Sequence, residues 1–228
     1  MINTLESQPE VSVILSVFNR EQYLNRCLDS LMIQSFKNWE LIAIDDGSED
    51  NSFEILKEYQ ILYHNIQLIR HKNMKLPLSR NKGILASNSK FITFIDSDDE
   101  YTKDHLKMRV EYLNAHPEVD MIRGGIKIIG NEYVRDKNNP FKMIHLSECT
   151  VGATFFGRRY VFLHLNGFQN LEYSEDSDFL DRAEKCFRVD KVDFNTYKYY
   201  REVPDSITNN YFKSDIPSPP PPEVKFPN

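Results

Sequence analysis

The amino-acid sequence predicts an α/β fold in which a mostly parallel sheet carries helices on both faces, in a single continuous domain. In the first half of the chain, short apolar runs rich in β-forming residues alternate with segments of helical periodicity. Polar or turn-forming residues follow most of these runs. Strands and helices that alternate in this order form βαβ units, and such units build a parallel sheet of the Rossmann-like type.

The elements of the first half follow from these patterns. We expect strands at residues 11–18, 39–48, 66–71 and 90–95. Apolar residues at helical spacing predict one helix around Leu24 to Leu31 and a second around Phe53 to Tyr59. A third helix is expected over residues 77–87, since proline suits the first turn of a helix.

The alternation weakens after Asp99, and the second half is predicted to mix several kinds of element. A helix is expected over 102–116, opened by Thr102, and another over 174–187, capped by Ser174. The other expected elements are a strand or strand pair at 119–130, a strand with a short helix and a turn at 154–168, and two strands at 188–194 and 196–203. Residues 211–228 form a proline-rich tail, which cannot join the interior of a sheet.

Composition limits the class of protein. The 228 residues are 40% hydrophobic and 27% charged, as in a folded protein with a sizeable core. The formal net charge of -6 argues against a nucleic acid as the main partner, because no basic stripe offsets it. The three cysteines have no paired spacing, which disfavours a disulfide framework or a zinc site. No leader and no apolar run near ~20 residues is seen, so we expect a cytoplasmic protein, with peripheral contact to the inner face of a membrane left open.

A cluster of acidic residues follows the strand expected at 90–95, in the stretch KFITFIDSDDEY. Asp96, Asp98 and Asp99 repel one another there unless a cation lies among them. Two other expected strands end in polar stretches, FNR at 18–20 and DDGS at 45–48. Because ligands of such sheets bind beyond the carboxyl ends of the strands, we expect the three stretches to border one crevice. Spacing alone leaves a solvated acidic loop as the alternative.

Three further residues have both a structural and a functional interpretation. Asp46 suits the turn before a helix, and it can also accept a hydrogen bond from a nucleobase. Arg80 is either a solvated residue of a surface helix or a ligand of phosphate. Asp176 stands at a helix start, where an acid complements the helix dipole without any catalysis. The absence of Gly-x-Gly-x-x-Gly and Walker sequences excludes dehydrogenases of the Rossmann type and P-loop proteins.

Three stretches, taken in order, resemble the family 2 glycosyltransferases, which are inverting enzymes with the GT-A fold. The stretches are VSVILSVFNREQYLNRCLDSLMIQSFKNWELIAIDDGSEDNS, LSRNKGILASNSKFITFIDSDDEY and GFQNLEYSEDSDFLDR. The resemblance is strong over residues 11–115 and looser to about residue 209. It implies a nucleotide-sugar-binding half at 1–100 and an acceptor-binding half at 101–210 of the same GT-A domain.

The resemblance also implies donor-binding residues. Phe18 and Asn19 look like the residues that bed the nucleotide base, and Asp46 looks like the carboxylate that reads the base. Arg80 is similar to the family arginine near the base and phosphates, and Asp96 would hold the ribose side.

For the chemistry, the resemblance implies a metal and a base. Asp98 would hold the Mg²⁺ or Mn²⁺ that bridges the diphosphate, with Asp99 as a supporting neighbour. Residues 152–154 resemble the segment on the acceptor side, and Asp176 resembles the general base. The weakest likeness is that of Arg201, in the stretch 199–210, to a phosphate-binding residue of the closing segment.

The chain departs from the family pattern at three points. Ser16 stands where members usually have proline, and no histidine follows His164, so a C-terminal histidine ligand of the metal is missing. The Gln-x-x-Arg-Trp motif of processive members is absent as well. We therefore expect transfer of one sugar at a time, with the cation held by Asp98, the diphosphate and water.

Taken together, these features predict a metal-dependent inverting glycosyltransferase. Its expected donor is a nucleotide-diphosphate sugar, taken as a UDP-sugar, and its acceptor a glycan or lipid-linked hydroxyl in cell-surface polysaccharide synthesis. The alternative is a GT-A-like protein that binds the nucleotide without turnover. A nucleotide-sugar pyrophosphorylase fits less well, because the glycine-rich signature near the N-terminus is not seen.

Overall fold

A computed structural model describes residues 8–136, 139, 141–201 and 203 of the chain. The predicted order of strands and helices in the first half is confirmed. The helices and strands from the N-terminus to residue 115 are β1 (Val11–Val17), α1 (Glu21–Met32), β2 (Trp39–Asp45), α2 (Ser52–Leu62), β3 (Ile66–Arg70), α3 (Leu76–Ala86), β4 (Phe91–Asp96), β5 (Glu100–Tyr101) and α4 (His105–Ala115). Those that follow are β6 (Met121–Ile129), β7 (Tyr133–Arg135), β8 (Met143–His145), the 3₁₀ turns η1 (Leu146–Glu148) and η2 (Gly152–Thr154), β9 (Phe156–Arg158), α5 (Arg159–His164), α6 (Glu175–Cys186) and β10 (Val189–Tyr200).

The main sheet is mixed but mostly parallel, as the sequence predicts. Eight strands lie in the order β3-β2-β1-β4-β9-β6-β10-β5. The strands β3, β2, β1 and β4 run parallel to one another, and β10 runs parallel to β6. The short strand β9 runs antiparallel between β4 and β6 and joins the two halves into one sheet.

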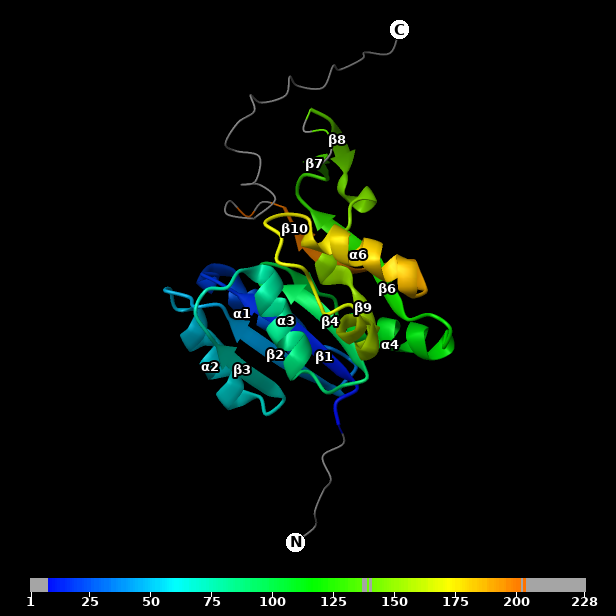
Figure 1. Cartoon of the computed structure of the whole chain (residues 1–228). Coiled ribbons are helices and arrows are strands. Elements are labelled where there is room, and N and C mark those ends of the chain that lie inside the picture. The colour runs from blue at the N-terminus through cyan, green and yellow to red at the C-terminus, as the bar shows by residue number, and fades with distance from the viewer. Residues whose placement is uncertain (1–7, 137–138, 140, 202, 204–228) are drawn as a thin grey trace.

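Helices cover both faces of this sheet, and the alternation of side chains along β1 explains why. Val11, Val13 and Leu15 belong to a buried cluster that includes the apolar residues of α1 and α4, together with Leu56 of α2. Ile14 points to the other face and belongs to a second cluster with residues of α3, α5 and α6. Figure 1 shows α3 lying across one face of β1 and β2.

Two predictions in the second half are wrong in detail. The helix expected from Thr102 begins at His105, because the Thr102 amide donates to the Thr196 carbonyl (2.9 Å). The two strands expected after residue 188 are one strand, β10, whose pairing with β6 is irregular between Val192 and Tyr197. Within that irregular part Asn195 has a φ of 50°, a left-handed conformation that interrupts the regular alternation.

The start of α6 also differs from the prediction. Ser174 has a φ of 63° and makes no capping hydrogen bond through its side chain. The α6 start is nevertheless acidic, as expected, with Glu175, Asp176 and Asp178 in its first turn.

A small hairpin of β7 and β8 stands apart from the main sheet. Its strands pair antiparallel, and in Figure 1 it projects beyond β10 and α6. No sequence pattern predicted this hairpin. Among the described residues, no helix is long and apolar enough to span a membrane. The proline-rich tail at 211–228 lies outside the described residues, as does most of the stretch 199–210.

Candidate functional site

The predicted crevice exists at the carboxyl ends of the parallel strands. Ser16 of β1 lies opposite Asp96 of β4, and Val17 lies opposite Asp45 of β2, so three strands end side by side. A cleft of about 1130 Å³ opens at this edge. It is bordered by every residue that the sequence predicts for the site: Phe18, Asn19, Asp46, Arg80, Asp96, Asp98 and Asp176.

Arg80 is buried between two acidic groups of the cleft. It is only 4% exposed, so its interpretation as a solvated surface residue is wrong. Its guanidinium contacts the Asp96 carboxylate at 2.8 Å and the Glu175 carboxylate at 3.2 Å. Burial opposes the charge, but these two carboxylates outweigh it and raise the pKa of Arg80. Arg80 therefore carries a fixed positive charge that links β4 to α6.

Asp176 is held by main-chain amides at the start of α6. Its carboxylate accepts hydrogen bonds from the Ser177 amide (2.7 Å) and the Gly152 amide (3.2 Å). Burial and the neighbouring Glu175 raise the pKa of Asp176 to about 6, although Arg80 and the amides oppose the shift. A carboxylate with this pKa is ionised near neutral pH and basic enough to accept a proton.

Gly152 packs directly against this carboxylate. A Cβ atom at position 152 would lie 2.8 Å from the Asp176 Cβ and 3.2 Å from an Arg80 guanidinium nitrogen. No side chain fits there without moving Asp176 or Arg80. The prediction that residues 152–154 belong to the site agrees with this close approach.

The carboxylates of the acidic turn after β4 have different environments. Asp99 is 2% exposed, and its carboxylate accepts hydrogen bonds from the Tyr197 hydroxyl and the Tyr200 amide, both at 2.8 Å. Burial, together with Asp98 and Asp96, raises the pKa of Asp99 well above its usual range. Asp96, Asp98 and Asp99 all border the cleft, and Asp96 also contacts Arg80.

On the other side of β1, Asp46 is almost fully buried and shapes the loop before α3. Its carboxylate accepts a hydrogen bond from the Met74 amide (2.7 Å) and lies 3.2 Å from the His71 ring nitrogen Nδ1. Phe18, by contrast, is 42% exposed on the wall of the cleft. An exposed aromatic ring beside a fixed carboxylate suits a nucleobase, since the ring offers a stacking face and the carboxylate a hydrogen-bond acceptor.

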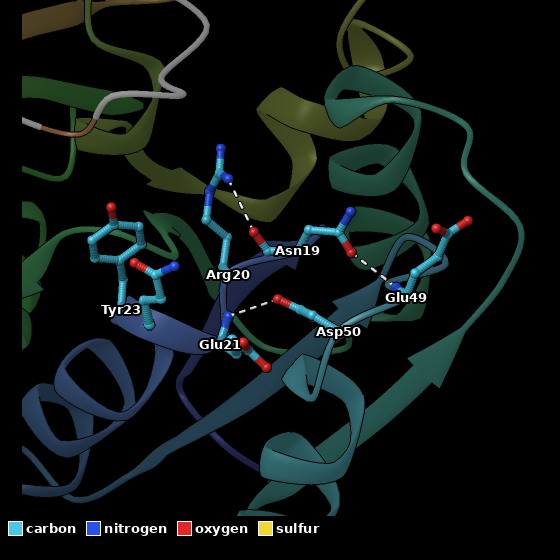
Figure 2. A pocket seen from close by; sticks show the side chains of 7 residues that line it. Asn19, Arg20, Glu21, Tyr23, Glu49 and Asp50 are labelled. Atoms are coloured by element: carbon cyan, nitrogen blue, oxygen red, sulfur yellow. Dashed lines mark hydrogen bonds between the residues drawn. The ribbon is translucent and has the colours of Figure 1, made fainter.

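Asn19 lies where the cleft meets a smaller hollow of about 560 Å³, drawn in Figure 2. Its side-chain oxygen accepts a hydrogen bond from the Glu49 amide (2.8 Å), and its carbonyl accepts one from Arg20 (3.1 Å). Asp50 accepts a hydrogen bond from the Glu21 amide in the same figure (3.0 Å). Asn19 thus fastens the loop after β1 to the loop after β2, in addition to bordering the cleft.

Comparison with protein families identifies the chain. A model described as Glycosyl transferase family 2 matches residues 12–170. The chain belongs to glycosyl transferase family 2. The matched residues include Phe18, Asn19, Asp46, Arg80, Asp96 and Asp98, and they end before Asp176.

Two relatives in this family are similar to the chain over most of its length. Glycosyltransferase GlyA of Streptococcus pneumoniae is 31% identical over 171 residues, which are 73% of this chain and 22% of the relative. Minor teichoic acid biosynthesis protein GgaA of Bacillus subtilis is 29% identical over 192 residues, 75% of this chain and 42% of the relative. The chain thus spans less than half the length of either relative.

Solved structures confirm the GT-A architecture. TarS (residues 1–349) of Staphylococcus aureus in complex with UDP-GlcNAc superposes with a TM-score of 0.73 at 20% identity, covering 89% of this chain and 61% of that one. The mannosyltransferase PcManGT of Pyrobaculum calidifontis, in complex with GDP-Man and Mn²⁺, gives a TM-score of 0.69 at 17% identity, covering 88% and 59%. At these identities the likeness establishes the fold.

The carboxylates of the cleft fit a metal ion that binds together with the nucleotide. Within the described part of the chain, no three His, Cys, Asp or Glu side chains gather closely enough to hold an ion. Asp96 is paired with Arg80, Asp99 is hydrogen-bonded to Tyr197 and Tyr200, and both border the cleft together with Asp98, the metal-binding carboxylate of the prediction. Mg²⁺ is commonly bound by one or two carboxylates together with substrate phosphates and water. The Asp98 carboxylate fits such a site, in which a diphosphate and water would complete the ligands of the ion.

Sequence reasoning missed several residues that border or support the cleft. The hairpin contributes Val134 and Ile144 to its wall, and Arg26 and Tyr197 hold the acidic turn from α1 and β10. The sequence patterns single out none of these residues as a candidate for the site. Only their tertiary contacts reveal them, because each lies far along the chain from the residue that it supports.

Proposed function

We propose that the protein is a metal-dependent inverting glycosyltransferase that moves one sugar from a nucleotide-diphosphate sugar to an acceptor hydroxyl. One observation carries the proposal. Asp98 and Asp176, from opposite halves of the chain, border the same cleft, and Arg80 links the acidic groups to which they belong. A displacement at an anomeric carbon needs a base on the nucleophile side and charge compensation on the leaving-group side, and the two carboxylates suit these tasks.

On the nucleophile side, Asp176 would act as the general base. An acceptor hydroxyl attacks well only when its proton is removed during the attack. The Gly152 and Ser177 amides orient the carboxylate, and its pKa of about 6 keeps it ionised at neutral pH. A single displacement from the face opposite the leaving group inverts the anomeric configuration. The same raised pKa favours turnover over the alternative of a nucleotide-binding protein without catalysis.

On the leaving-group side, this chain would bind the nucleotide diphosphate. Phe18, Asn19 and Asp46 form the wall on which the base would lie, and Asp96 would take the ribose side. Asp98 would hold Mg²⁺ or Mn²⁺ against the diphosphate. When bound, the ion would offset the negative charge that grows on the departing diphosphate. Arg80, buried and positively charged, would keep Asp96 in place and add positive potential near the phosphates.

The substrates follow from the relatives by analogy. TarS was solved with UDP-GlcNAc and PcManGT with GDP-Man, and we propose a UDP-sugar as the donor. GgaA is a protein of teichoic acid biosynthesis, which supports a glycan or lipid-linked acceptor in the synthesis of a cell-surface polymer. The cytoplasmic location and the peripheral contact with the membrane stay predictions of the sequence.

Calorimetric titration tests the donor site. UDP is titrated into the wild type and the Asp98→Asn variant, with and without Mn²⁺, and GDP serves as the competing nucleotide. We expect Mn²⁺ to tighten UDP binding in the wild type, and we expect Asp98→Asn to remove that gain. The donor sugar is then identified by measuring UDP release from UDP-GlcNAc and other UDP-sugars.

A matched control is Asp104→Asn, which removes a carboxylate that hydrogen-bonds Ser35 outside the cleft. It should bind UDP and Mn²⁺ as the wild type does. A wild type that binds neither nucleotide with or without metal would contradict the proposal. Unchanged metal dependence in Asp98→Asn would contradict the role of that residue.

A further inference from the structure

The acidic turn after β4 is held from two sides, by side chains of α1 and of β10. Residues 96–100 form a tight turn, closed by the hydrogen bond from the Asp99 amide to the Asp96 carbonyl (3.0 Å). From β10, Tyr197 and Tyr200 hold the carboxylate of Asp99. From α1, Arg26 reaches the turn at the residue that the proposed function assigns to the metal.

Arg26 makes three kinds of contact at this turn. Its guanidinium donates a short hydrogen bond to the Asp98 carbonyl and lies 3.2 Å from the Glu100 carboxylate. The same guanidinium stacks over the Tyr200 ring at 3.7 Å. A planar guanidinium can make all of these contacts at once, whereas the single ammonium of a lysine cannot. Arg26 thus fixes the main chain of Asp98 between α1 and β10.

Lys198 and Tyr200 also contact Glu100, so the pairing with Glu100 can be tested separately from the contact between Arg26 and Asp98. The Glu100 carboxylate pairs with Lys198 (2.8 Å) and accepts a hydrogen bond from the Tyr200 hydroxyl (2.6 Å). Lys198 contacts the same acid as Arg26 but, in the described contacts, not Asp98. The side chains of Lys198 and Arg26 are similarly exposed, at 33% and 38%.

We infer that Arg26 is a positioning residue, which orients the carboxylate of Asp98 toward the cation bound with the nucleotide diphosphate. This inference rests on the proposed function, since it assumes that Asp98 binds that cation. Groups that orient a metal ligand commonly change metal affinity by 10–100-fold when they are removed. Loss of Arg26 should therefore weaken binding of the metal without weakening the contacts of the nucleotide base.

The test measures metal binding rather than activity. Mn²⁺ is titrated into the full chain at saturating UDP or GDP, and free Mn²⁺ is followed by electron paramagnetic resonance, for the wild type, Arg26→Gln, Arg26→Lys and Lys198→Gln. We expect Arg26→Gln to raise the apparent Kd for Mn²⁺ about tenfold or more. Arg26→Lys should remain weakened although its charge is kept, and Lys198→Gln should match the wild type. Metal-free nucleotide affinity should be the same in all four proteins, and a thermal unfolding transition should show that each of them is folded.

Each contrary outcome overturns a different part of the inference. If the wild type shows nucleotide-dependent Mn²⁺ binding and Arg26→Gln matches it, Arg26 does not position Asp98, while the proposed function stands. If Arg26→Lys restores wild-type affinity, or Lys198→Gln is weakened equally, the effect is one of net charge and the positioning role is wrong. If the wild type binds no Mn²⁺ with either nucleotide, the proposed metal site fails, and the role of Arg26 fails with it.

Discussion

The two acidic groups of the cleft, Asp96–Asp99 after β4 and Glu175–Asp176 at the start of α6, are held in different ways. Side chains from distant elements hold the first group, through Arg80, Tyr197 and Arg26. Main-chain amides of Gly152 and Ser177 hold Asp176 in the second. Neighbouring carboxylates thus acquire different properties from their partners and not from their residue type.

Asp99 and Asp176 make this difference plain, because the pKa of each is raised. For Asp99, burial and two neighbouring aspartates raise the pKa well above its usual range, while its oxygens are occupied by Tyr197 and Tyr200. For Asp176, burial and one neighbouring acid raise the pKa to about 6, and Arg80 limits the shift. The first carboxyl suits a structural role, and the second remains able to exchange a proton near neutral pH.

The largest effect is expected from Asp176→Asn, which removes the proposed base from the second group. General-base catalysis typically contributes 10²–10⁴-fold, so kcat for sugar transfer should fall by roughly that factor. Nucleotide affinity should persist, because Phe18, Asn19 and Asp46, the residues proposed to bind the base, belong to the other half of the chain. Single-turnover transfer and UDP calorimetry measure the two quantities.

Asp178→Asn is the matched control for this variant. It removes an acid from the same helix turn that pairs with Arg182 (2.9 Å) instead of facing Gly152. It should transfer sugar as the wild type does. Full activity of Asp176→Asn would show that the second group is structural, as the helix-dipole interpretation holds.

A somewhat smaller effect is expected from Gly152→Ala, which displaces the same carboxylate without removing it. The added methyl group would stand 2.8 Å from the Asp176 Cβ, closer than packed atoms allow. A shift of a catalytic group by about 1 Å can cost around 10²-fold in rate. We expect kcat to fall by up to about that factor while UDP affinity and its dependence on Mn²⁺ stay unchanged, as measured by kinetics and calorimetry. A parallel loss of nucleotide affinity would mean that Arg80 moves instead.

The pH dependence of transfer should report the Asp176 carboxyl. Its pKa is about 6, and the ionised form is the one that accepts a proton. Below pH ~6, kcat/KM should therefore fall about tenfold per pH unit, and above it the rate should level off until another group titrates. The pH profile of the rate should be measured at a fixed Mn²⁺ concentration and compared with the pH dependence of UDP binding. This comparison separates protonation of the base from loss of donor binding. A pH-independent rate between pH 5 and 7 would contradict the assignment.

Much of the first half could be predicted from its sequence because its elements are local. Apolar runs and helical spacing lie within single segments, and the rule that ligands bind beyond strand ends brings FNR, DDGS and DSDD to one edge. The second half is less predictable, because its main strands pair with segments that are distant in the sequence. The irregular part of β10 at Asn195 and the β7–β8 hairpin depend on pairing between distant segments.

The same distinction applies to the site. Asp46, Asp96, Asp98 and Asp176 stand next to strand or helix ends and are visible in the sequence. The burial of Arg80 is not visible there, because its two carboxylate partners lie 16 and 95 residues away. Arg26 and Tyr197 are hidden for the same reason, since they act on a turn 72 and 101 residues distant.

The smallest effect is expected from Asp99→Asn, which tests whether adjacent carboxylates of the first group differ as their contacts indicate. The side-chain oxygen of the introduced asparagine can still accept from the Tyr200 amide, and its NH₂ group can donate to the Tyr197 hydroxyl in place of the present bond. Because Asp99 is 2% exposed and both of its carboxylate oxygens are already hydrogen-bonded, the substitution changes little at the surface of the cleft. UDP calorimetry should show that the affinity of Asp99→Asn for UDP in the presence of Mn²⁺ is within a few-fold of that of the wild type. For Asp98→Asn, the same measurement should show that the gain from Mn²⁺ is lost. Equal losses in the two variants would mean that the cation is shared between both carboxylates, and the division of the first group into a metal-binding and a structural acid would be wrong.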